Sequence, residues 1–121
     1  MDKQRISELS EVARKIRVGI IDAVHSAKSG HPGGSLSCVE IILALYENVL
    51  RIKPEDPKWA DRDRFVLSKG HCSETLYTIF SDLGAYDMQY MIDNFECLDK
   101  SEFGMHSNRK YVPAIEVSAG S

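Results

Sequence analysis

The sequence predicts a helix-rich α/β chain with a few parallel strands, and two observations carry this prediction. Apolar residues recur three to four positions apart in several long stretches, which is the spacing of helices that pack on a core. One short apolar run, residues 65–67, precedes a glycine-containing turn and another such stretch, in the order strand, turn and helix. The length of 121 residues and a hydrophobic content of 43% fit one globular domain.

The first expected helix covers residues 6–27, where isoleucine, leucine, valine and alanine repeat at helical spacing. Gly19 lies inside this stretch and indicates close packing against a neighbour. The helix is expected to end near Gly30, because glycine accepts the left-handed conformation at a helix C-terminus and Pro32 follows.

The second expected helix starts at Ser37, since residues 37–40 have the pattern of a capping box. It runs to Val49 and is apolar on more than one face, which predicts deep burial. Ile41 is one of the apolar residues on which this prediction depends.

The remaining elements follow the apolar run at residues 65–67. A third helix is expected over residues 73–80, with a glycine stop at Gly84, and a fourth over residues 88–95. Residues 96–111 have no periodic pattern and are expected to be irregular. A second short strand is expected at residues 114–117.

Composition excludes several classes of function. The net charge of -3 and the lack of lysine and arginine clusters among aromatic residues exclude a nucleic-acid-binding surface. No apolar run is long enough to span a membrane, and the polar N-terminus does not resemble a signal peptide. Cys38, Cys72 and Cys97 are odd in number and lack metal-ligand spacing, which is typical of reduced thiols in a cytoplasmic protein.

Two stretches are candidates for a binding site. The turn between residues 67 and 73 contains Gly70 and His71 and opens a helix, where free N–H groups favour an anion such as a phosphate. The loop over residues 29–35 contains three glycines, a proline and His31, so its backbone can approach a ligand closely. Each stretch, taken alone, fits a simple connector equally well.

Four segments together resemble the N-terminal, diphosphate-binding domain of the transketolases, and most closely the split type whose halves are separate chains. These segments are residues 29–37, 61–71, 104–110 and 113–121, in the family's order and at family-like spacing. The resemblance implies that residues 1–121 are the N-terminal portion of that domain, truncated before its metal-binding part.

The resemblance implies a transferase of aldehyde or ketone groups that uses thiamine diphosphate, as in the pentose phosphate pathway. It would transfer a two-carbon ketol unit between sugar phosphates. His71 would contact the cofactor diphosphate, and Gly34 would lie near the cofactor. His31 would face the thiazolium and the substrate hydroxyls, where an imidazole that titrates near neutrality suits hydrogen bonding and proton transfer.

The later segments would complete this site. His106 falls seven residues before Pro113, at the place of a family histidine that hydrogen-bonds the substrate. Gly120 and Ser121 would begin a loop that runs along the cofactor. Cys72 stands where the family usually has glycine or alanine, and a thiol fits that space with little strain.

The resemblance also implies Mg²⁺, with ligands expected beyond residue 121, because no cluster of acidic residues here supplies its oxygen ligands. Expected partners are sugar phosphates, further copies of the chain and a C-terminal transketolase subunit. Catalysis by this chain alone is not expected. Two alternatives stay open: a thiamine enzyme like 1-deoxyxylulose-5-phosphate synthase, and a non-catalytic fragment that acts as a binding or assembly module.

Overall fold

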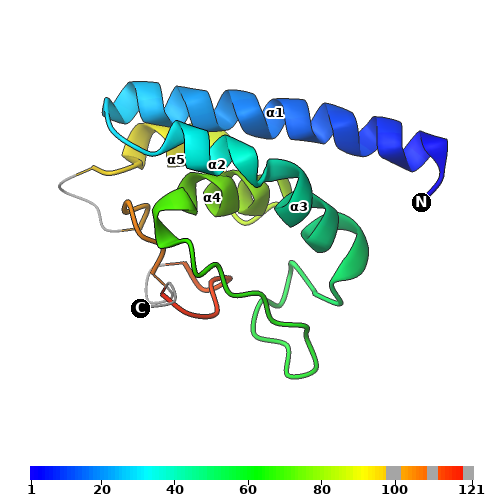
Figure 1. Ribbon diagram of the computed structural model, residues 1–121. Helices are drawn as coiled ribbons and strands as arrows, with labels where there is room; N and C mark the ends of the chain where they lie inside the picture. The colour runs from blue at the N-terminus through cyan, green and yellow to red at the C-terminus, as the bar shows by residue number, and fades with distance from the viewer. Residues whose placement is uncertain (98–101, 109–111, 119–121) are drawn as a thin grey trace.

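The computed structural model describes residues 1–97, 102–108 and 112–118. The helices in this part of the chain form a bundle (Figure 1). The long helix α1 (Lys3–Ala27) runs along one side, and the four other α-helices pack against it or against each other. They are α2 (Pro32–Ser37), α3 (Val39–Ala44), α4 (Ser73–Asp82) and α5 (Met88–Asn94). A π-helical turn, η1 (Leu45–Val49), continues α3, and a 3-10 turn, η2 (Gly70–Cys72), leads into α4.

The first expected helix is confirmed as α1. One stripe of its side chains is buried against α2, α3, α4 and α5, as the apolar spacing predicts. The helix ends in a left-handed residue, but this residue is Lys28, with φ of 55°, and not a glycine. Gly19 does mark close packing, because a Cβ there would lie 3.0 Å from Sδ of Met88 and 3.1 Å from Cγ2 of Thr78.

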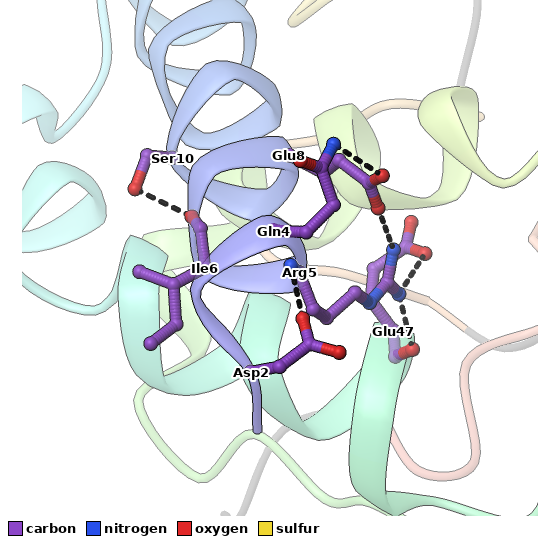
Figure 2. A network of polar contacts seen from close by, with 7 residues as sticks. All are labelled: Asp2, Gln4, Arg5, Ile6, Glu8, Ser10 and Glu47. Carbon is purple, nitrogen blue, oxygen red and sulfur yellow. Dashed lines mark hydrogen bonds and ion pairs between the residues drawn. The ribbon is translucent and has the colours of Figure 1, made fainter.

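A polar network joins the first turn of α1 to η1 (Figure 2). Asp2 caps the helix by accepting a hydrogen bond of 2.8 Å from the backbone N–H of Arg5. The Arg5 guanidinium donates to the backbone oxygen of Glu47 at 2.8 Å and lies 3.7 Å from its carboxylate. Burial and the neighbouring Asp82 carboxyl raise the pKa of Glu47, although Arg5 opposes the change.

The predicted start of the second helix, at Ser37, is wrong. Helical structure begins at Pro32, because proline is favoured in a first helical turn, and it breaks at Cys38 between α2 and α3. The expected capping box does not form, since the Ser37 hydroxyl donates backward to the carbonyl of Gly34 at 2.7 Å. The prediction of deep burial is also wrong for part of this segment, because the exposed fraction of Ile41 is 65%.

Neither expected strand is present, and the described parts of the chain contain no strand at all. Residues 65–67 and 114–117 lack regular structure, although Phe65 packs on the ring of Tyr46 and Ile115 is buried. A strand exists only where a neighbouring segment exchanges backbone hydrogen bonds with it, and no described segment does so here. The helix-rich part of the fold prediction is therefore confirmed, and the parallel strands are not observed.

The last two helices agree with the sequence. All residues from Ser73 to Phe80 in α4 are buried, and Gly84, with φ of 95°, follows the end of this helix. The described residues between 96 and 108 are irregular, as expected. Within the portion that the structure describes, no helix has the length and apolar character needed to cross a membrane.

Candidate functional site

The fold brings three of the predicted site residues together. His31 immediately precedes α2, Gly34 lies inside α2, and His71 lies in η2, just before α4. The ring centroids of His31 and His71 are 5.1 Å apart, with an angle of 65° between the ring planes. A Cβ on Gly34 would lie 3.5 Å from Cδ2 and Nε2 of His71. The two candidate stretches therefore form one site.

Cys72 fills the space behind Gly34. A Cβ at Gly34 would lie only 2.8 Å from the Cys72 sulfur, so any larger residue at this position would force the thiol to move. Cys72 is fully buried, and burial raises the pKa of its thiol. The thiol therefore acts as a packing group in this structure, in keeping with the expectation that it fits the space of a smaller residue.

A buried carboxylate that sequence reasoning missed connects the two stretches. Glu74 is 1% exposed, and its Oε1 accepts a hydrogen bond of 2.9 Å from the backbone N–H of His31. Its Oε2 accepts a hydrogen bond of 2.6 Å from the Ser35 hydroxyl. The carboxylate also explains Gly30, which has φ of 145° and where a Cβ would approach Oε1 to 2.7 Å.

Two further side chains hold α2 against the start of α4. The Thr75 hydroxyl donates to the carbonyl of Ser35 at 2.7 Å. The exposed Lys69 ammonium donates to the carbonyl of Gly34 at 3.3 Å and to the Ser37 hydroxyl at 3.2 Å. Lys69 thereby places a positive charge beside the glycine, close to His71 in the chain. Sequence reasoning missed this contribution, although the position of Lys69 directly before Gly70 and His71 could have indicated it.

The His31 ring carries a polar atom without a partner. Its Nδ1 is buried and makes no hydrogen bond. Because buried polar atoms are normally hydrogen-bonded, an atom of this kind at a candidate site indicates a place for a ligand group.

His106 is only partly brought to this site. The carbonyls of Gly104 and Met105 accept hydrogen bonds from the Ser73 hydroxyl at the start of α4, which anchors the segment there. The His106 side chain is exposed and has no observed contact with His31 or His71. Gly120 and Ser121 lie outside the described residues. In residues 1–97, 102–108 and 112–118, no group of three or more histidine, cysteine, aspartate or glutamate residues could hold a metal ion.

The site thus combines two imidazole rings, an ammonium and a glycine packed against one of those rings, on a helical scaffold. Residues 9–121 match the family described as "Transketolase, thiamine diphosphate binding domain". The chain belongs to this family.

Similar proteins agree with this assignment. The chain is 39% identical to Transketolase 1 of Escherichia coli (strain K12) over 95% of its length, and spans 17% of that protein. It is 37% identical to one subunit of the apulose-4-phosphate transketolase of Phocaeicola vulgatus over 97% of its length, and spans 41% of that protein. The chain thus corresponds to less than half of each of these relatives.

Solved transketolase structures have the same fold over this region. A structure of the Campylobacter jejuni transketolase superposes with a TM-score of 0.83 at 34% identity, covering 99% of this chain and 18% of that chain. The Pichia stipitis transketolase in complex with sedoheptulose-7-phosphate gives a TM-score of 0.83 at 36% identity, covering 93% of this chain and 16% of that chain.

Proposed function

We propose that this chain supplies the diphosphate-binding part of a transketolase site, in which a two-carbon ketol unit passes between sugar phosphates. The observation that carries this proposal is the meeting of His31, Gly34 and His71, with the two imidazole centroids 5.1 Å apart. These are the residues to which the family resemblance gives cofactor and substrate roles. Family membership supports the cofactor as thiamine diphosphate.

The residues present suit this cofactor. His71 is proposed to donate a hydrogen bond to the diphosphate, and the Lys69 ammonium, which donates to the carbonyl of Gly34, is proposed as a further donor to it. A side chain at position 34 would contact the ring of His71, since a Cβ there would lie 3.5 Å from its Cδ2 and Nε2 atoms. When bound, thiamine diphosphate supplies the nucleophilic carbon that carries the two-carbon unit.

His31 is proposed to act on the substrate. Its unpartnered Nδ1 supports a role in holding a substrate hydroxyl and moving a proton to or from it. His106 is proposed as a second hydrogen-bond donor to the substrate, through movement of its exposed side chain. Gly120 and Ser121 are proposed to line the cofactor.

The wider setting is part of the same proposal. Mg²⁺ is proposed to be held by ligands outside residues 1–121, which are proposed to be the N-terminal portion of the domain. A C-terminal subunit is proposed as partner, supported by the relative from Phocaeicola vulgatus, whose name makes it one subunit of a transketolase. Self-association, a cytoplasmic location and a role in the pentose phosphate pathway complete the proposal.

The test is a calorimetric titration of thiamine diphosphate with Mg²⁺ into the chain, by itself and with a candidate C-terminal subunit. We expect binding only with the subunit, and its loss in His71→Ala. The matched control is His25→Ala, because His25 is exposed in the last turn of α1 and should bind as wild type.

Each contrary outcome has a definite meaning. Tight, Mg²⁺-dependent binding by the chain alone would show that the metal ligands are within this chain. No binding of thiamine diphosphate in either sample would favour the non-catalytic binding or assembly module. Binding followed by formation of 1-deoxyxylulose 5-phosphate, without ketol transfer, would favour the synthase-like alternative. The Ser-Gly-His-Pro and Ser-Lys-Gly-His sequences favour the transketolase outcome.

A further inference from the structure

The helix that carries the glycine-rich stretch is not stable through its own residues. α2 has only six residues, and two of them are Gly33 and Gly34, which destabilise a helix relative to alanine. His31 stands at its N-cap and makes no side-chain capping hydrogen bond. The position of the His31 imidazole therefore depends on contacts from outside α2.

Glu74 provides the outside contact at His31. Its two carboxylate oxygens bind different ends of the first turn of α2, with the backbone N–H of His31 at 2.9 Å and the Ser35 hydroxyl at 2.6 Å. The backbone at Gly30 packs against the same carboxylate, because a Cβ there would lie 2.7 Å from Oε1 of Glu74. This packing restricts the backbone that leads into α2.

The chemistry of this contact is unusual for a purely structural group. Glu74 is 1% exposed, and both of its hydrogen-bond donors are neutral. Burying a carboxylate with neutral donors costs free energy that an apolar side chain would avoid. Glu74 is the second residue of α4, where the positive end of the helix dipole offsets part of that cost.

We propose that Glu74 is a positioning residue of the site, which fixes the His31 imidazole opposite His71 by holding the backbone of His31. The proposal rests on the proposed function for the role of His31. Glu74 acts on His31 through the backbone N–H of that residue, whereas its carboxylate makes its hydrogen bonds to His31 and Ser35 and none to the His71 side chain. Loss of Glu74 should therefore impair proton transfer by His31 more than cofactor binding by His71.

The first experiment measures hydrogen–deuterium exchange of the His31 amide in the chain without ligand. Glu74→Ala should reduce the protection of this amide about tenfold or more, because hydrogen bonds to charged groups contribute about 1.5–3 kcal/mol. Glu74→Gln keeps a neutral acceptor and should lose about threefold to fivefold. Glu55→Ala is the control, because Glu55 is exposed and distant in sequence. Unchanged protection in Glu74→Ala would overturn the proposal.

The second experiment compares kcat for ketol transfer with the Kd of thiamine diphosphate, in the enzyme assembled with its C-terminal subunit. Glu74→Ala should lower kcat about tenfold while the Kd changes less than about threefold, and Glu74→Gln should restore most of kcat. Equal losses in kcat and cofactor affinity would indicate only a structural role and would overturn the proposal.

The two experiments separate this inference from the proposed function. If the wild-type enzyme transfers no ketol unit, the proposed function fails, and His31 exchange still decides whether Glu74 holds this backbone. If Glu74→Ala does not fold, the exchange measurement is made on Glu74→Gln, and wild-type protection of the His31 amide in that variant would overturn the role of the carboxylate.

Discussion

Two adjacent glycines in α2 have different surroundings, which gives a direct test of the site at the scale of single residues. A Cβ on Gly34 would lie 2.8 Å from the Cys72 sulfur, whereas nothing lies within 4 Å of a Cβ on Gly33. Neither has a backbone conformation that excludes alanine, since the glycines with a positive φ in the described part of the chain are Gly30 and Gly84. The difference between these two positions is therefore one of space alone.

We expect Gly34→Ala to lower the free energy of unfolding by about 1–3 kcal/mol, because the added methyl group overpacks the site. Gly33→Ala is the matched control and should be neutral or stabilising by up to about 1 kcal/mol, through helix propensity. Urea denaturation measures both changes. Adding Cys72→Ala to Gly34→Ala should recover stability, and no recovery would show that the clash lies elsewhere.

The burial of Cys72 predicts its reactivity. Because the thiol is fully buried and burial raises its pKa, it should react with a thiol reagent at neutral pH far more slowly than Cys38 and Cys97, which are partly exposed. Site-resolved labelling by mass spectrometry measures the three rates. In denaturant the three rates should converge, and fast labelling of Cys72 in the native protein would contradict its placement behind Gly34.

At the scale of elements, α1 is the scaffold on which the other helices rest. Its buried stripe faces α2, α3, α4 and α5, and the exposed residues between these positions face away. Ile20 is fully buried in this stripe, whereas 47% of the adjacent Ile21 is exposed. The helix therefore offers two neighbouring isoleucines with opposite environments.

Ile20→Ala should lower the free energy of unfolding by about 2–5 kcal/mol, because it removes buried methyl groups and leaves a cavity. Ile21→Ala should change it by no more than about 0.5 kcal/mol, as for most surface substitutions. Thermal or urea unfolding compares the two variants. Similar losses in both would mean that Ile21 is covered in the protein as it exists in solution.

At the scale of the whole molecule, one ion pair joins segments far apart in the sequence. Arg62 donates two hydrogen bonds, of 2.7 and 2.8 Å, to the carboxylate of Glu116. Both side chains are mostly buried, at 12% and 13% exposure. The pair attaches residues 112–118 to the loop before η2, and so holds the segment that leads toward Gly120 and Ser121.

This pair predicts a pH dependence. The hydrogen bond from Arg62 holds the pKa of Glu116 below its ordinary value of 4.5. The stabilisation is therefore present above pH 4.5 and is lost as the pH falls through the lower, folded-state value. Hydrogen–deuterium exchange of residues 112–118 should rise in that window. Glu116→Gln should show raised exchange already at neutral pH and little further change, and a wild-type profile in this variant would contradict the assignment.

The sequence was sufficient for the elements that depend on local pattern. Helical spacing located α1, α4 and α5, and the described residues among 96–108 are irregular as expected. Histidine beside glycine in a turn is a chemical signal that is visible in the residues themselves, and it singled out His31 and His71 as candidates. The family resemblance added Gly34, and the fold brings the three residues together.

Tertiary contacts determined the rest. Pro32–Ser37 is helical because Glu74, Thr75 and Lys69 bind its backbone and side chains, although its glycines favour a loop. The short apolar runs at residues 65–67 and 114–117 matched a strand locally, but pairing requires a neighbour that no local pattern supplies. Glu74 gave no sequence signal, because a glutamate in a first helical turn is common and only the folded chain places His31 and Ser35 against it.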